Sequence, residues 1–174
     1  MNDKAKNHVL YRQVNDTDLP VIMAMYTELN SYFYKLRYRL PHPKYVGLVW
    51  LDSFQRTLGR FGNIFIAEIE NQVVGFMLCR IKQVPQYMGG VLVGELSDMW
   101  ILSSARRMGI GDKLSRLSID WLRGQGAHSI EIQVLRDNEA SWKLYERMGF
   151  KLEYRAGRLL WEDYIESDDL NKDA

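Results

Sequence analysis

Cysteine and long apolar runs are nearly missing from this sequence of 174 residues, and each absence excludes a class of protein. Its single cysteine, Cys79, excludes an intramolecular disulfide framework and a cysteine-rich zinc site, which favours a reducing compartment such as the cytoplasm. No run approaches the ~20 apolar residues of a membrane span. The polar start, residues 1–7, lacks the apolar stretch of a signal peptide. We therefore expect a soluble intracellular protein without a membrane partner.

An excess of charge and a metal-ligand pattern are missing as well. Lys and Arg number 23 against 22 Asp and Glu, so the formal net charge is +1 and no global field would recruit nucleic acid. The three histidines, His8, His42 and His128, lie far apart and show no metal-ligand spacing, so we expect no metal. No Gly-x-Ser-x-Gly elbow is present, which disfavours a hydrolase.

Repeats and Pro-, Gly- or Ser-rich linkers are also absent, so nothing divides the chain into two domains. At about one domain's length, with 47% hydrophobic residues, the chain is able to bury one core. We assign residues 1–165 to this domain. Residues 166–174 are polar and mostly acidic, which is typical of a solvated terminus.

The spacing of apolar residues changes along the chain and predicts alternating helices and strands. Glu70-Asn71-Gln72 separates two runs rich in Ile, Val and Phe, which indicates a hairpin. The order predicts a single α/β domain with a mixed central sheet flanked by about four helices. The expected strands are 9–14, 63–70, 72–82, 91–102, 128–135 and one or two within 150–161; the expected helices begin near residue 19 and cover 45–58, 109–123 and 138–148.

A glycine-bearing turn, residues 101–112, joins an apolar strand to an amphipathic helix. The first amides of a helix have no partner within the helix and lie at the positive end of its dipole, so such a turn binds phosphate groups well. Glycines at 109 and 111 would let the backbone approach a ligand closely. The turn is not a Walker loop, because no Lys-Ser or Lys-Thr follows at the required spacing. Leu114 stands where a Rossmann motif needs its third glycine. Tight packing alone would also explain both glycines.

Two motifs stand on either side of the expected strand 128–135: Arg106-x-x-Gly109-x-Gly111 before it and Asn138-x-Ala-x-x-x-Leu-Tyr145-x-x-x-Gly-Phe after it. Together they resemble the GNAT superfamily of N-acetyltransferases. The first matches the superfamily's Arg/Gln-x-x-Gly-x-Gly/Ala signature, and the second is similar to the second half of its cofactor region. Arg107 departs from the pattern, because many members carry glycine there, and its charge would lie near the phosphates. The resemblance implies the family's fold over nearly the whole chain.

The resemblance also implies acetyl-CoA as the acyl donor substrate. The main-chain groups of Ile101 and Leu102 would contact the pantetheine arm, and the Ile101 amide would polarise the thioester carbonyl. Asn138 would contribute to cofactor binding, although capping of the next helix explains this residue equally well. The turn residues implied in binding the CoA pyrophosphate are Arg106, Arg107, Met108, Gly109, Ile110, Gly111 and Asp112.

Three side chains are candidates for the chemistry of acyl transfer to an amine by direct attack. Tyr145 would act as general acid to the departing CoA thiolate, since a phenol of pKa about 10 is a competent donor. Glu95 is the leading candidate for the base that takes the amine proton, and Asp98 is the second. A regular strand would point these two carboxylates to opposite faces, but the family often has a bulge here. Either carboxylate would also be explained as a plain surface group.

The acceptor amine remains open between polyamines, amino acids, aminoglycoside-like molecules and protein N-termini. The resemblance implies contacts from residues 31–45 and 83–90, the first dense in Tyr and basic residues, where Arg37 or Arg39 would recognise a carboxylate. A homodimer is compatible with the family, although no segment specifies an interface. The alternative function is a catalytically inactive sensor or scaffold of the same fold that binds acyl-CoA and transfers nothing.

Overall fold

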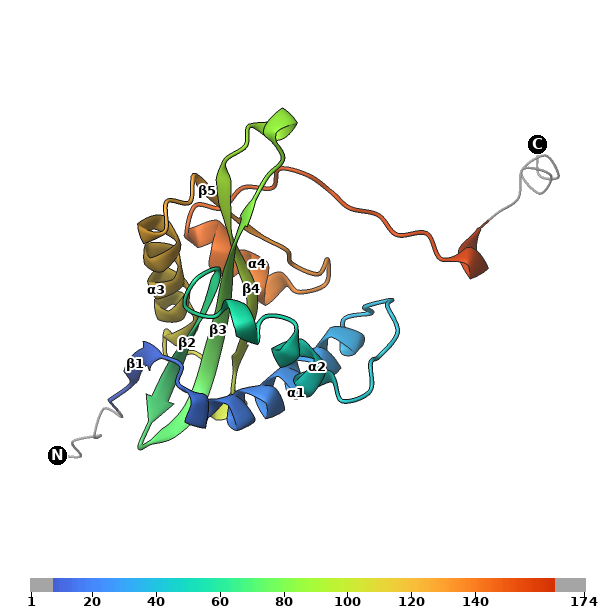
Figure 1. The fold of residues 1–174 in the computed structure, drawn as a ribbon. Helices are drawn as coiled ribbons and strands as arrows, with labels where there is room; N and C mark the ends of the chain where they lie inside the picture. The colour runs from blue at the N-terminus through green and yellow to red at the C-terminus, as the bar shows by residue number, and fades with distance from the viewer. Residues whose placement is uncertain (1–7, 165–174) are drawn as a thin grey trace, which may run out of the picture.

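The computed structural model describes residues 8–164, in which five strands form one mixed sheet in chain order (Figure 1). The strands are β1 (Leu10–Gln13), β2 (Gly62–Ile69), β3 (Gln72–Gln83), β4 (Leu92–Ile101) and β5 (Ser129–Ile132). The first four pair antiparallel, and β5 pairs parallel to β4. Glu70 and Asn71 join β2 to β3 with φ values of 50° and 62°, as a two-residue hairpin turn requires. The predicted hairpin is confirmed.

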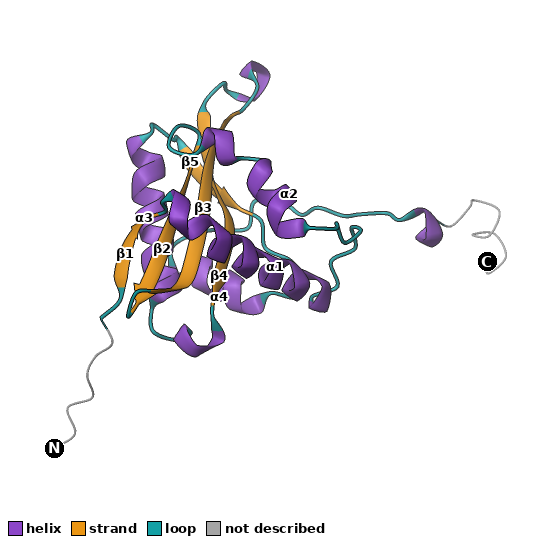
Figure 2. Cartoon of the chain, turned by 60° about the horizontal axis from the view of Figure 1, so that its bottom comes forward, coloured by secondary structure: helices purple, strands orange, loops and turns teal. Residues whose placement is uncertain are grey.

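Helices cover both faces of the sheet, because its central strands are apolar on both sides (Figure 2). On one face lie α1 (Leu19–Lys35) and α2 (Val46–Asp52), whose buried residues pack on Ile64, Phe76 and Leu78. On the other face α3 (Ile110–Gly124) and α4 (Glu139–Arg147) pack on Phe65, Met77 and Cys79. The predicted fold class, an α/β domain with four helices around a mixed sheet, is confirmed.

The helices on the first face differ in length from the prediction. α1 continues through Lys35, so the first third of residues 31–45, the segment expected to contact an acceptor, is helical. α2 ends at Asp52 and a separate 3-10 turn, Gln55–Thr57, follows, whereas the sequence predicted one helix over 45–58. The two helices approach closely at Gly47, where a Cβ atom would lie 2.5 Å from the Met23 carbonyl oxygen. Only glycine fits this crossing.

The strands expected within residues 150–161 are wrong. Residues 151–160 have no regular secondary structure, and the chain runs away from the sheet to a 3-10 turn at Trp161–Asp163 (Figure 1). The alternating apolar residues suit a strand, but within residues 8–164 no strand pairs with this segment. Its large side chains are consequently exposed, with Trp161 at 87%. Asp163 accepts a hydrogen bond from Arg39 near the end of this arm.

The predicted acidic tail, residues 166–174, lies outside the described residues, as does the polar start. Within residues 8–164, no helix is long and apolar enough to cross a membrane.

The contact at Gly47 yields a stability prediction. Gly47→Ala should lower the free energy of unfolding by about 1–3 kcal/mol, because the new methyl group pushes α2 away from the rigid backbone of α1. Gly124→Ala is the matched control: nothing lies within 4 Å of its Cβ position at the end of α3, so alanine should stabilise by roughly 0.5 kcal/mol. Urea denaturation of both variants measures the difference. Equal effects at the two positions would contradict the close crossing.

Candidate active site

The site begins where β4 and β5 part. Their parallel pairing ends at Leu96 and Ile132, while β4 continues to Ile101. At the same point β4 contains a bulge: Cys79 of β3 pairs with Leu96 and Leu78 pairs with Asp98, so Ser97 is the extra residue. From Ser97 to Ile101, no strand of residues 8–164 covers the edge of β4 that β5 has left.

The main chain of Ile101 faces that open edge. The Leu102 amide donates to the Val74 carbonyl of β3 at 2.9 Å, so Leu102 points toward β3 and its neighbour Ile101 points away from it. The Ile101 carbonyl accepts a hydrogen bond from Arg106 Nε at 3.0 Å, which leaves the Ile101 N–H directed at the open edge. The Leu102 carbonyl already accepts from the Ala105 amide. Of the two residues expected to meet the pantetheine arm, Ile101 is therefore the better placed.

The glycine-bearing turn presents the first amides of α3 to solvent. Arg107 and Gly109 have φ values of 65° and 78°, and these left-handed conformations fold the chain sharply into the helix. Gly109 is the capping residue of α3, and it has no side chain that would cap the helix N-terminus. Buried Ile110 fixes the first turn to the core. Glycine would adopt the left-handed conformation of Arg107 without strain. The uncapped amides at the start of α3 form a helix terminus of the kind that suits an anion.

Two side chains of this turn have internal partners. The Arg106 guanidinium lies 4.8 Å from the centroid of the Trp100 ring as well as donating to Ile101, so it braces the turn against β4. Asp112, in the first turn of α3, is paired with Arg116 at 2.8 Å, which offsets its negative charge beside the helix terminus. The side chains of Arg107 and Met108 are exposed.

Asn138 and Tyr145 both lie on α4, as the sequence predicts. Asn138 caps the helix, since its side-chain oxygen accepts from the Ser141 amide at 3.3 Å. Tyr145 is 6% exposed and packs edge-on against Phe150. Burial raises the pKa of Tyr145 to about 12, although the neighbouring Ser115 hydroxyl lowers it. The phenol is therefore fully protonated at neutral pH.

Glu95 and Asp98 share one face of the sheet because of the bulge at Ser97. Glu95 pairs with Arg80 and Asp98 with Leu78, and these two residues of β3 alternate onto the face covered by α1 and α2. Arg80 contacts Glu95 at 3.5 Å and donates to Ser97 at 2.9 Å. The regular-strand expectation of opposite faces is thus wrong, and both carboxylates lie on the same side.

Asp98 is held against α2 by a hydrogen bond. Trp50 of α2 donates from Nε1 to Asp98 Oδ2 at 3.0 Å. Burial raises the pKa of Asp98 above its ordinary value, against the lowering effects of this hydrogen bond and of the Arg80 charge. A carboxylate with a raised pKa is a stronger base, which suits proton transfer near neutral pH. Sequence reasoning missed Trp50, because its spacing with Leu51 and Phe54 indicates only a core helix.

Of the two segments expected to contact an acceptor, only one lies near the candidate base. Arg37 is paired with Asp137 at 2.7 Å, and Arg39 with Asp163, so both predicted carboxylate-binding arginines already have acidic partners. Residues 83–90 connect β3 to β4 at the end of β4 remote from Ile101, about 30 Å away at the rise of a strand. Residues 31–45, in contrast, lie beside α2 and Trp50.

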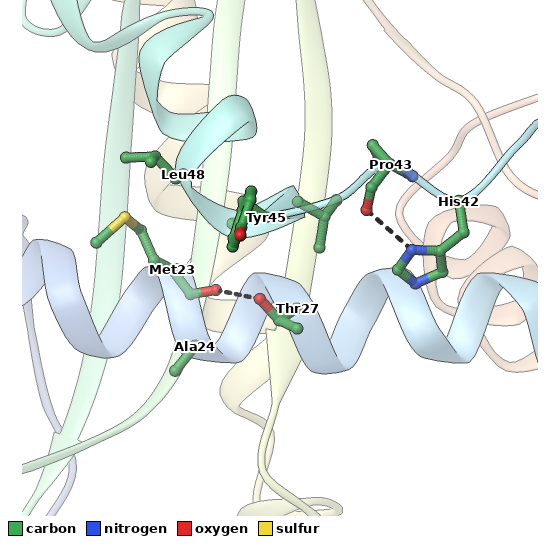
Figure 3. A pocket seen from close by; sticks show the side chains of 9 residues that line it. Met23, Ala24, Thr27, His42, Pro43, Tyr45 and Leu48 are labelled. Carbon is green, nitrogen blue, oxygen red and sulfur yellow. Dashed lines mark hydrogen bonds between the residues drawn. The ribbon is translucent and has the colours of Figure 1, made fainter.

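Two hollows flank the α1–α2 crossing. One is a shallow apolar surface groove that includes Met23, Thr27, Tyr45 and Leu48 (Figure 3). The other, with a volume of about 350 Å³, is lined by Tyr26, Asn30, Tyr34, Tyr38 and Trp50 among others, and we call it the aromatic pocket. Because Trp50 contacts Asp98, the aromatic pocket adjoins the candidate base.

The comparisons with known proteins agree with this geometry. Residues 22–150 match the profile of the Acetyltransferase (GNAT) family, so the chain belongs to this family. N-alpha-acetyltransferase 30 of Schizosaccharomyces pombe is 33% identical over 86 residues, which are 49% of this chain and 55% of that protein. Mycothiol acetyltransferase of Renibacterium salmoninarum is 32% identical over 89 residues, 51% of this chain and 26% of that protein. The chain thus spans about half the length of the first relative and about a quarter of the length of the second.

A solved structure shares the fold. The aminoglycoside N-acetyltransferase AAC(6')-Iy, in complex with CoA, superimposes with a TM-score of 0.71 at 20% identity, over 90% of this chain and 97% of that one. The recognised family and the fold predicted from the sequence are therefore both confirmed.

The environment of Asp98 predicts a pH-dependent stability. In the folded protein, the pKa of Asp98 is raised above the value of about 3.9 for an unfolded chain. The carboxyl therefore favours folding most when the pH is below that unfolded value. This contribution to stability is lost as the pH rises through the folded-state pKa. Asp98→Asn keeps an acceptor for Trp50 and should raise the Tm more at pH 8 than at pH 4. Asp52→Asn, at an exposed position in α2, is the control. An equal effect of Asp98→Asn at both pH values would contradict the assignment.

Proposed function

We propose that the chain transfers an acetyl group from acetyl-CoA to a primary amine by direct attack of the amine on the thioester. The observation that carries the proposal is the continuity between the open edge of β4 and the amides that begin α3. The open edge of β4 suits the amide-bearing pantetheine arm, and the amides that begin α3 suit an anion. An extended donor such as acetyl-CoA carries its pyrophosphate and its thioester at separate points and would lie along this surface.

The residues of the turn would hold the donor mainly through their main chain. The amides from Arg107 to Asp112 would bind the pyrophosphate, and Arg106 would keep the turn in position through Ile101 and Trp100. Asn138 would contribute by fixing the start of α4. Ile101 and Met99 would offer main-chain groups to the pantetheine arm, since both point away from β3 in the register of the sheet.

The proposed reaction forms a carbon–nitrogen bond, breaks a carbon–sulfur bond and moves one proton. The amine nitrogen forms a bond to the thioester carbon, and the Ile101 N–H stabilises the negative charge that develops on the carbonyl oxygen. The carbon–sulfur bond breaks as the proton leaves the amine nitrogen. We assign that proton to Asp98, one residue beyond the bulge and beside the aromatic pocket, rather than to Glu95, which lies before the strands part.

Tyr145 would donate a hydrogen bond to the departing CoA thiolate and keep its own proton. The conjugate acid of a thiolate has a pKa near 8.5 in the unperturbed case, well below the value of about 12 for this phenol. Tyr145 therefore remains protonated and available as a donor, and the solvent supplies the proton that completes the thiol. Burial of the side chain keeps its position fixed.

A covalent acyl-enzyme on cysteine does not fit this chain. Its single cysteine, Cys79, is fully buried in the centre of the sheet, and burial raises the pKa of its thiol to about 11. The thiolate needed for nucleophilic attack is scarce at neutral pH. Direct attack by the amine is the mechanism that the residues support.

The partners follow from this proposal. The acceptor is an amine of a small molecule or a protein, and we place the reaction in the cytoplasm, in keeping with the single cysteine. Homodimerisation would cover the exposed apolar side chains of residues 151–164 with a second copy of the chain. The alternative, an inactive sensor that binds acyl-CoA, would lack turnover.

The experiment is a thiol-release assay with acetyl-CoA and a panel of amines. Tyr145→Phe should lower kcat by roughly 100-fold or more, while the acetyl-CoA Kd from calorimetry stays nearly unchanged. Tyr11→Phe, a tyrosine packed against the same core cluster, should keep full activity. An unchanged kcat in Tyr145→Phe would remove this residue from the mechanism. Acetyl-CoA binding without thiol release from any amine would favour the sensor instead.

A further inference from the structure

The aromatic pocket has an uncharged and mainly apolar lining. Tyr26, Tyr34, Tyr38 and Trp50 provide aromatic walls, and no acidic or basic side chain is among the residues that line it. Its volume of about 350 Å³ exceeds the roughly 150 Å³ that holds one benzene molecule. An aryl or branched alkyl group with an amine attached would therefore fit.

One polar group in this lining lacks a partner. Asn30 of α1 is 5% exposed, and its Oδ1 has no hydrogen-bond partner within residues 8–164. Leaving a buried acceptor unpaired costs about 1–3 kcal/mol, so such a group in the wall of a pocket indicates a donor that arrives with a ligand. The two other unpartnered side chains, Ser115 and Ser118, lie on α3, on the opposite face of the sheet.

Trp50 links the pocket to the candidate base. Its ring stacks on Tyr26 with centroids 4.2 Å apart and an angle of 11° between the planes. Its indole N–H donates to Asp98 at 3.0 Å. A group bound among the aromatic side chains is thus next to the carboxylate that would take the amine proton. Negative charge on the acceptor would meet Asp98, while Arg37 and Arg39 are already paired with Asp137 and Asp163.

We propose that the aromatic pocket selects an acceptor whose primary amine stands next to an uncharged aromatic or bulky apolar group, with Asn30 Oδ1 accepting a hydrogen bond from the acceptor. The inference rests on the proposed acetyl transfer and specifies its substrate class. It excludes amino acids with a free carboxylate next to the amine as good acceptors, and it ranks polyamines, which lack an apolar group of this size, below aryl-bearing amines. Asn30 and Trp50 are the specificity-determining residues.

Three matched acceptors test this class. L-phenylalaninamide carries the ring and a neutral amide, L-phenylalanine replaces the amide with a carboxylate, and glycinamide lacks the ring. The kcat/KM of L-phenylalaninamide should exceed that of each of the others by about tenfold or more, since the ring is buried and the amide N–H pairs with Asn30. Equal values for the three acceptors would overturn the proposal.

The variant Asn30→Leu separates binding from folding. It removes the unpaired oxygen, so its Tm should rise or stay equal, while its kcat/KM for L-phenylalaninamide should fall by about tenfold and its acetyl-CoA Kd should not change. Ser118→Ala removes an unpaired hydroxyl on the opposite face and should leave acceptor preference as it is. A lower Tm in Asn30→Leu with unchanged acceptor preference would show a purely structural asparagine and overturn the proposal.

A binding readout keeps this inference separate from the proposed function. Calorimetry with L-phenylalaninamide and free CoA requires no turnover, and it should show saturable binding that Asn30→Leu weakens. Turnover of glycinamide without preference for the aromatic acceptor would overturn the pocket assignment and leave acetyl transfer standing. Saturable binding of L-phenylalaninamide without thiol release would support the pocket and contradict the transfer reaction.

Discussion

The parting of β4 and β5 beyond Leu96 and Ile132 is the constraint on which the rest of the site depends. A parallel pair that continued to Ile101 would use the main-chain groups of β4 for sheet hydrogen bonds. Because the pairing stops, these groups face an open edge that leads directly to the amides at the start of α3. The bulge at Ser97 lies at the same point and turns Asp98 onto the face of α1 and α2. The proposed donor and acceptor sides therefore meet at one strand.

The two sides of β4 differ in their physical character. On the side of the turn, the proposed binding would depend on main-chain amides held by left-handed residues and a buried anchor, so it would tolerate changes of exposed side chains such as Arg107. On the side of α1 and α2, aromatic rings and one buried amide would determine which acceptor group fits. The close crossing at Gly47 holds α2 against α1 and so fixes Trp50 beside Asp98. The proposed donor site thus adjoins the proposed acceptor pocket across β4.

Much of the fold and part of the candidate site could be predicted from the sequence, because they depend on local patterns of residues. The hairpin at Glu70 and Asn71 and the amphipathic α3 follow from local patterns. The turn could be predicted because glycine, as at Gly109, adopts positive φ without strain. The common face of Glu95 and Asp98 could not be predicted, since a bulge depends on pairing between strands. The strands expected within 150–161 failed because an alternating pattern specifies a strand only when an edge is available to pair with it. Asn30 carried no signal, because burial without a partner is a tertiary property.

The central claim is that main-chain amides of the turn bind the pyrophosphate of the donor. Calorimetric titration of CoA into Gly109→Ala and Gly126→Ala tests it most directly, because both glycines have φ near +80° and neither has an atom within 4 Å of its Cβ position. Both variants should lose about 1–2 kcal/mol of stability through backbone strain, but only Gly109→Ala, at the start of α3, should bind CoA about tenfold more weakly. Equal CoA affinities in the two variants would contradict the account.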